Sequence, residues 1–162
     1  MKEIVAQRMS AQLEGDFVVF LIGFRVNRFW KVHKWWPVFR SMRPMIDELV
    51  ANPDSGFLNA EVAWGNPLIM VQYWRSVDDL MRYAADREAE HLPAWKRFNQ
   101  QVGSNGDVGI WHETYMVDSG AYEAVYNNMP RFGLATAGSL APAEGRWANA
   151  RGRLEANRKA AA

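Results

Sequence analysis

This 162-residue chain has few histidines and no cysteines, the side chains that most readily transfer protons near neutral pH or bind soft metals. It contains no cysteine, which excludes thiol nucleophiles, iron–sulfur clusters and thiolate-bound zinc or haem. Its three histidines are His33, His91 and His112. We expect them on a loop, at a helix joint and on a strand, without the regular spacing of a metal site. The sequence therefore predicts no metal centre.

His112 stands in the middle of a predicted strand over residues 108–117. Its imidazole is either a hydrogen-bonded core group or a general base or donor in a pocket between sheet and helices. Side chains alternate along a strand, so Trp111 and Glu113 face the opposite way. We predict that His112 faces the helices, because burial beside a polar ligand costs less than burial in an apolar interface. Trp111 then lines the pocket only if a bulge intervenes or the faces are reversed.

His91 precedes Pro93 at the joint between two predicted helical segments. One interpretation is that His91 hydrogen-bonds free carbonyl groups at a helix end. The other is that it contacts a ligand, because the break at Pro93 redirects its side chain. One turn later, Trp95 and Asn99 share a helix face. We therefore count His91 among the candidate catalytic residues, and Trp95 and Asn99 among the candidate substrate-binding residues.

Arg25 and Asn27 lie at the end of a predicted buried strand over residues 17–26. A cation and an amide in this position suit the orientation of a substrate carbonyl or oxyanion, with Arg25 in a catalytic role and Asn27 in a binding role. The alternative for Arg25 is an ion pair with Glu113 across the sheet.

Aromatic residues are unusually frequent, with eight Trp, eight Phe and five Tyr. Such residues are most often part of a core, but they also form walls around flat ligands. We take four tryptophans, Trp36, Trp74, Trp95 and Trp111, as candidate pocket walls, and we count Tyr73 among the candidate substrate-binding residues.

The order of elements predicts an α+β fold. Four strands are predicted, over residues 17–26, 57–64, 67–74 and 108–117. One predicted helix opens at Pro37 and is kinked or split by Pro44, and a second is capped by Ser76 and Asp79. The resulting β–α–β–β–α–β order is the ferredoxin-like arrangement, with two helices on one face of an antiparallel sheet. Because the other face is then open, we expect a homodimer.

The two ends of the chain carry weaker signals. Residues 1–16 are polar without a clear period and are interpreted as an arm, with at most a short helical turn. Residues 17–138 are predicted to form the ferredoxin-like domain. The Arg- and Ala-rich end of residues 139–162 is interpreted as a tail that is either a fraying helix or disordered.

Composition narrows the functional classes further. Hydrophobic residues make up 49% and charged residues 23%, as in an average globular protein, and the net charge is +1. The small charge gives no electrostatic footprint for nucleic acid or an anionic membrane. The longest apolar run is too short to span a bilayer, and the first residues do not resemble a signal peptide, so a cytoplasmic location is expected. Dinucleotide-binding, P-loop and esterase motifs are absent from the sequence.

Several segments together resemble a known family. They are FLIGFRVN near the start of the domain, KVHKWWPV (31–38), VQYWRS (71–76), HLPAWKRFN (91–99), GDVGIWHETY (106–115) and AYEAVYNNMPRFGLA (121–135). These segments are similar to a bacterial and fungal family related to a monooxygenase of fumagillin biosynthesis. That family belongs to the dimeric α+β barrel superfamily, together with the antibiotic-biosynthesis monooxygenases.

The resemblance implies a ferredoxin-like protomer, dimerisation through the sheets and a pocket between sheet and helices. Related monooxygenases oxidise an aromatic or polyketide-like substrate with O2 and without a cofactor. The superfamily also contains haem proteins of the aldoxime-dehydratase type with an axial histidine, a role that His91 or His112 would take here. A non-catalytic binder of a small ligand is the third function compatible with this fold.

Overall fold

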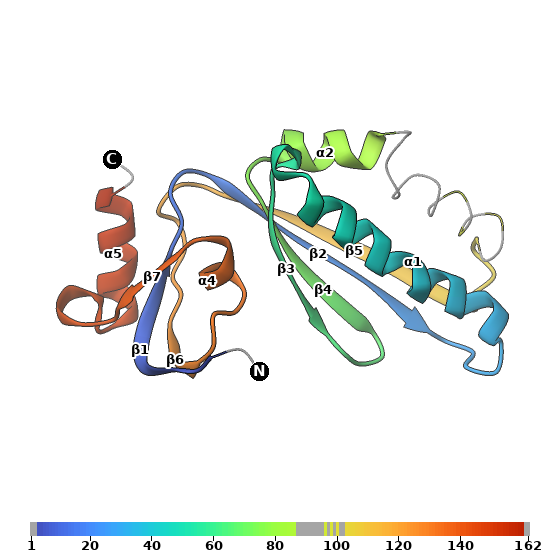
Figure 1. Ribbon diagram of the computed structural model, residues 1–162, viewed down its shortest axis with the longest axis horizontal. Coiled ribbons are helices and arrows are strands. Elements are labelled where there is room, and N and C mark those ends of the chain that lie inside the picture. Colours follow the sequence, from blue (N-terminus) through green and yellow to red (C-terminus); the bar gives the residue numbers. More distant parts are fainter. Residues whose placement is uncertain (1–2, 87–95, 97, 99, 101–102, 161–162) are drawn as a thin grey trace.

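The computed structural model describes residues 3–86, 96, 98, 100 and 103–160 (Figure 1). Its strands are β1 (Val5–Gln12), β2 (Phe17–Val26), β3 (Phe57–Ala63), β4 (Leu68–Trp74), β5 (Val108–Val117), β6 (Tyr126–Met129) and β7 (Ser139–Pro142). Its helices are α1 (Val32–Ala51), α2 (Val77–Ala85), α4 (Leu134–Ala137) and α5 (Ala150–Ala160).

Four strands form an antiparallel sheet in the order β3-β4-β2-β5. The central strand β2 pairs along most of its length with β4 and along all of it with β5. With α1 following β2 and α2 following β4, this is the ferredoxin-like topology. The α+β fold class predicted from the sequence is confirmed.

Helices α1 and α2 lie on the same face of this sheet (Figure 1). At one end of α1, Phe39 and Met42 pack against Phe24 on β2. At the other end, Leu49 joins Trp74 of β4 in a cluster that also contains Leu80 of α2. Burial of these apolar side chains stabilises the sheet–helix layer at roughly 25 cal/mol per Å² removed from water.

Helix α1 is longer and more regular than the sequence predicted. It begins at Val32, five residues before Pro37, and it continues through Pro44 to Ala51. Both prolines are exposed, whereas Val38, Phe39 and Met42 pack against the sheet. Packing along this side outweighs the lost hydrogen bonds at the prolines, because tertiary contacts supply most of the stability of a helix.

A second, three-stranded sheet joins the two ends of the chain in the order β6-β1-β7. Residues 5–12, predicted as part of an arm, form its central strand, with β6 and β7 both antiparallel to it. The arm interpretation of these residues was wrong in its secondary structure. A polar strand of this kind is stabilised by pairing with segments more than a hundred residues away, which no local pattern reveals.

The end of the tail is the helix α5, which is anchored by polar contacts. Arg153 is only 3% exposed, forms an ion pair with Glu123 and donates to the carbonyl of Trp147 at 2.8 Å. Asn157 donates through Nδ2 to the carbonyl of Tyr122 at 2.8 Å. These contacts dock α5 on the rest of the chain, whereas the sequence predicted either a fraying helix or a disordered end.

The second sheet also covers part of the first sheet's far face, opposite α1. Ala11 of β1 and Leu134 of α4 join Phe17 of β2 in one apolar cluster. Tyr73 and Val117 of the four-stranded sheet pack against it. The far face is therefore covered at one end, whereas the sequence predicted that all of it would be open.

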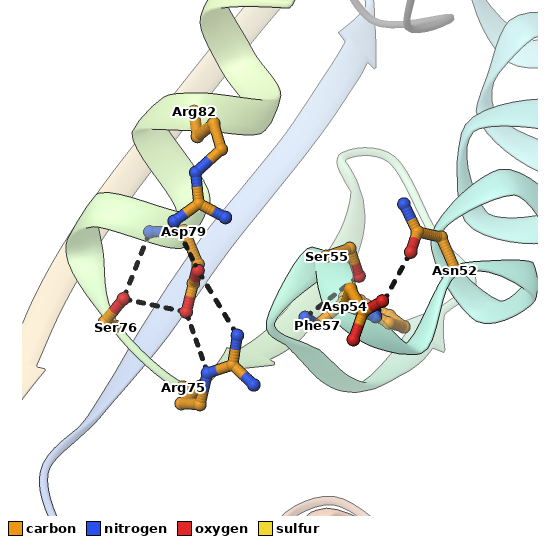
Figure 2. Close-up of polar contacts among 8 residues, drawn as sticks. All are labelled: Asn52, Asp54, Ser55, Phe57, Arg75, Ser76, Asp79 and Arg82. Atoms are coloured by element: carbon orange, nitrogen blue, oxygen red, sulfur yellow. Dashed lines mark hydrogen bonds and ion pairs between the residues drawn. The ribbon is translucent and has the colours of Figure 1, made fainter.

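The start of α2 is held by a buried carboxylate, that of Asp79 (Figure 2). Ser76 caps the helix, because its Oγ accepts a hydrogen bond from the Asp79 amide at 3.1 Å, as the capping box predicted. Arg75 and Arg82 reach the carboxylate from either side, at 3.1 and 2.8 Å. Burial alone would raise the pKa of Asp79, but the hydrogen bonds from Arg75, Ser76 and Arg82 outweigh it and hold the pKa below its ordinary value.

Gly56 packs directly against this carboxylate. Its φ of +79° lies in the left-handed region, and a methyl group there would collide with the Asp79 side chain. We predict that Gly56→Ala lowers the free energy of unfolding by roughly 2–3 kcal/mol, from backbone strain plus the collision. Gly15→Ala is the matched control, because Gly15 has a φ of +75° with open space around it. Gly15→Ala should lower the free energy of unfolding, measured with urea, by only about 1 kcal/mol. An equal loss in the two variants would contradict the packing argument.

The lowered pKa of Asp79 predicts how the contribution of this residue to the free energy of unfolding depends on pH. Its ionised form stabilises the fold above the ordinary carboxyl pKa, and this contribution is lost as the pH falls through the lower, folded-state pKa. Asp79→Asn should therefore lower the free energy of unfolding at pH 7, with a difference from wild type that shrinks at pH 3. Asp47→Asn is the control, since the Arg43–Asp47 pair has the same spacing but is exposed. Urea unfolding at both pH values measures this; a difference that stays constant would contradict the prediction.

Candidate functional site

A cavity of about 430 Å³ lies between the four-stranded sheet and the helices α1 and α2. Most of its described lining is apolar, including Phe20 and Ile22 of β2 and four methionines. The methionines are Met42, Met45, Met70 and Met81. The polar side chains of the described lining are Ser41, Gln72, Tyr83, His112 and Thr114. Methionine adapts its shape to a ligand, so this lining suits a flat or irregular apolar molecule.

Strand register decides which polar side chains reach the cavity floor. Ile22 of β2 pairs with Met70 of β4 and with His112 of β5, so the three side chains form one row across the sheet. Phe20 forms the next row, between Gln72 and Thr114. Residues directly opposite each other share a face, so both rows point toward the helices.

His112 lines the cavity on the helix-facing side of β5, as the sequence predicted for its orientation. Its ring lies 5.6 Å from the ring of Phe20 between centroids. In the single chain His112 is exposed, on the strand at the edge of the sheet. Its imidazole has no hydrogen-bond partner among the described side chains, so it is available to a ligand in the cavity.

Trp111 is on the opposite face of the sheet and does not line the cavity. It pairs with Gly23 of β2, and its indole Nε1 lies 2.9 Å from the position that a Cβ on Gly23 would occupy. The absence of a side chain at Gly23 therefore makes room for the indole. The predicted role of Trp111 as a substrate-binding wall does not fit this cavity, because β5 alternates without a bulge across this stretch.

Arg25 and Asn27 also lie away from the cavity lining. The Arg25 Nε donates to the Asn27 Oδ1 at 3.1 Å, and the Asn27 Nδ2 donates to the carbonyl of Gly106 at 3.2 Å. These contacts connect the end of β2 to the loop before β5. The predicted roles in catalysis and binding do not fit this cavity, and the partner of Arg25 is Asn27 rather than the Glu113 of the alternative.

Tyr73 packs on the far face beneath the second sheet, not in the cavity. Burial raises the pKa of its phenol, and Tyr126 and Glu61 raise it further. The Glu61 carboxylate accepts a hydrogen bond from the amide of Gly133 at 3.0 Å, just before α4. This group of polar side chains attaches α4 to the sheet. Tyr73 therefore lies on the other face of the sheet from Trp74, and its predicted part in substrate binding does not fit this cavity. Trp36 of α1, a predicted pocket wall, is likewise outside the described lining.

Three further candidates, His91, Trp95 and Asn99, lie outside the described residues. Phe98, from the same segment, is described and lines the cavity. The catalytic prediction for His91 and the binding predictions for Trp95 and Asn99 stay predictions.

Gln72 is the polar lining residue that the sequence analysis left out of the site. It is 8% exposed and stands between Met70 and Trp74 on the helix-facing side of β4. The signal was present in the alternation of residues 68–74, where Gln72 is the one polar residue on its face. Ser41 and Tyr83 reach the cavity from helices, where the sequence gave no reason to separate them from surface residues.

The described lining fits a neutral ligand better than it fits haem. Haem requires an axial ligand and, for its propionates, nearby cations. His112 supplies an imidazole, but lysine and arginine are absent from the described part of the lining. Nor do three His, Asp or Glu side chains gather into a metal-binding group anywhere in the described ranges.

Comparison with known proteins identifies the family. The family described as Monooxygenase af470-like matches residues 17–134, most of the chain. The chain belongs to this family. Membership confirms the resemblance found in the sequence. Monooxygenase af470 of Aspergillus fumigatus is 26% identical over 151 residues, which cover 79% of this chain and 53% of that protein. The chain thus spans about half the length of this relative.

Solved structures with a similar fold include two aldoxime dehydratases. Aldoxime dehydratase OxdRE, in complex with butyraldoxime, has a TM-score of 0.62 at 16% identity, covering 80% of this chain and 41% of that one. A second aldoxime dehydratase also reaches 0.62 at 16% identity, covering 85% and 43%. SnoaB, a cofactor-independent oxygenase from Streptomyces nogalater, has a TM-score of 0.45 at 15% identity, covering 62% and 91%. At 16% identity, the likeness to the two aldoxime dehydratases shows a shared fold and nothing about activity.

Within the described ranges, no helix combines the length and the apolar character that a membrane-spanning helix requires.

Proposed function

We propose that this protein is a monooxygenase that oxidises a small, largely apolar metabolite, aromatic or polyketide-like, in the cavity between sheet and helices. The observation that carries the proposal is the cavity: about 430 Å³ of mainly apolar space, with the His112 imidazole in its lining. Membership of the monooxygenase family supports the reaction class. Because the chain spans 53% of the length of monooxygenase af470, the activity itself is part of the proposal.

In the proposed reaction, His112 acts as a general base on a C–H bond next to a carbonyl group of the substrate. The electron pair left on carbon is delocalised onto the carbonyl oxygen as an enolate. The enolate then reduces O2 and forms a C–O bond with it. Loss of water from the resulting hydroperoxide leaves a second carbonyl, so that CH2 and O2 become C=O and H2O. The substrate supplies the electrons, and we propose that no cofactor takes part.

The apolar lining supports this chemistry by excluding water from the enolate. Phe20, Ile22 and the methionines replace solvent around the substrate, so a charge that develops there interacts strongly with the few nearby dipoles. A carbanion surrounded by water would instead be protonated again. The same lining selects substrates that lose little hydration on entry.

We further propose that the protein is a homodimer joined through the uncovered part of the far sheet face. Leu21, Val71 and Trp111 are half-buried on this face, and Tyr115 is 51% exposed. Burying such a surface against a second copy is favourable.

The proposed base predicts a large kinetic effect. We use 2-tetralone, a neutral bicyclic ketone with an acidic CH2 group, as the probe, and an oxygen electrode as the measurement. Wild-type protein should accelerate O2 uptake, and His112→Ala should lower kcat by at least about 100-fold, the usual contribution of a general base. His33→Ala is the control, because His33 is exposed and outside the described lining. Equal loss in both variants, or none in either, would rule out His112 as the base.

The proposed dimer predicts a mass of about twice 18.5 kDa by light scattering across a dilution series. Val71→Arg places a charge in the middle of the far face and should yield monomers, because an unpaired buried charge is costly. Met116→Arg is the control, since Met116 is 74% exposed on the helix-facing side of β5 and should leave the mass unchanged. A monomeric wild-type protein would contradict the proposal.

A further inference from the structure

Gln72 is the most deeply buried polar side chain in the described lining of the cavity, with 8% of its surface exposed. Its Oε1 accepts a hydrogen bond from the indole Nε1 of Trp74 at 2.9 Å. Its Nε2 lies 3.1 Å from the Sδ of Met70. A thioether is a weak acceptor, so this second contact uses little of the hydrogen-bonding capacity of the amide.

The orientation of this amide follows from the chemistry of its neighbour. An indole N–H only donates, so the amide atom facing Trp74 must be the oxygen, and the nitrogen must face the other way. Trp74 is fully buried and packs against Phe57 and Tyr83, which keeps the indole in place. The second N–H of Gln72 has no acceptor in the described part of the chain, although buried donors are normally paired.

The other polar lining side chains on the helices do not offer such a donor. The Ser41 hydroxyl donates to the carbonyl of Val38 at 2.8 Å. The Tyr83 hydroxyl lies 3.2 Å from the Glu48 carboxylate. Gln72 on β4 and the residues His112 and Thr114 on β5 are therefore the polar groups through which the described lining can bind a ligand.

We propose that Gln72 binds a carbonyl oxygen of the substrate, and that the substrates are uncharged, mainly apolar ketones. Lysine, arginine, aspartate and glutamate are absent from the described lining, so a charged substrate would lose its hydration without compensation. The second N–H of Gln72 can donate to an acceptor on the ligand. A carbonyl oxygen on an apolar ring system is such an acceptor, and because it is uncharged its burial costs less hydration free energy than burial of a charged group.

The position of Gln72 relative to His112 allows one substrate to contact both side chains during the proposed reaction. The two residues lie on the strands either side of β2, in neighbouring rows that contain Phe20 and Ile22. Strand spacing and rise put their Cα atoms about 12 Å apart, which leaves room for a ketone and its adjacent C–H between the side chains. As His112 takes the proton, negative charge grows on the oxygen that Gln72 contacts, so the N–H···O bond strengthens. This step rests on the function proposed above.

The test compares two ligands that differ only in the carbonyl group, 2-tetralone and tetralin, by equilibrium dialysis without O2. Wild-type protein should bind 2-tetralone more tightly than tetralin by roughly fivefold, the usual effect of one neutral hydrogen bond. Gln72→Met, which keeps the volume, should abolish this preference while still binding tetralin. Ser41→Ala is the matched control and should keep the preference, because its hydroxyl is already bonded to the helix.

A second variant covers the case in which Gln72→Met does not fold. Trp74→Phe keeps the Gln72 side chain but removes the N–H that orients its amide, so the preference for 2-tetralone should fall as well. Equal binding of both ligands by wild type, binding of neither, or an unchanged preference in the Gln72 and Trp74 variants would overturn the inference. Binding is measured apart from O2 uptake: a ketone preference without oxidation leaves the role of Gln72 intact and removes the monooxygenase proposal.

Discussion

The pairing of β2 with β4 on one side and β5 on the other is the constraint on which the rest of the structure depends. Both pairings are antiparallel and keep one register, so alternate residues of all three strands share a face. The set that includes Phe20 and Ile22 forms the floor of the cavity, and the set that includes Leu21 and Gly23 faces the other way. A shift by one residue would exchange the two sets. Neither the helices nor the second sheet would then meet their apolar partners.

The two faces of this sheet are covered differently. On the helix side, α1 and α2 leave about 430 Å³ unfilled, and the polar groups lining that space have few competing partners. On the far side, the sheet formed by both chain ends covers Tyr73 and leaves Val71 half-buried in the single chain. Gly23 belongs to the far side, where the absence of a side chain admits the indole of Trp111. The cavity and the proposed dimer surface thus lie on opposite faces of one sheet.

The chemistry of the cavity follows from how few of its dipoles are free. Ser41 and Tyr83 direct their hydroxyl groups to acceptors within the protein. The remaining polar groups are His112 at the sheet edge and Gln72 near the centre, with Thr114 beside Phe20. In an apolar space each such group interacts with a ligand more strongly than it would in water, since the local dielectric is low. The proposed base His112 and the proposed donor Gln72, at two positions along an apolar floor, suit a reaction in which a proton leaves carbon and charge builds on oxygen.

The sequence alone determined the elements of the sheet and the face of His112. The predicted strands match the observed ones to within one residue at each end, and Ser76 caps α2 as its spacing predicted. These features depend on alternation and capping, which are local properties of the chain. The tertiary structure alone decided that residues 5–12 form a strand, and that Tyr73 and Arg25 lie away from the cavity. These outcomes depend on which distant segments meet across a face, because pairing and burial are long-range interactions that a local pattern does not encode.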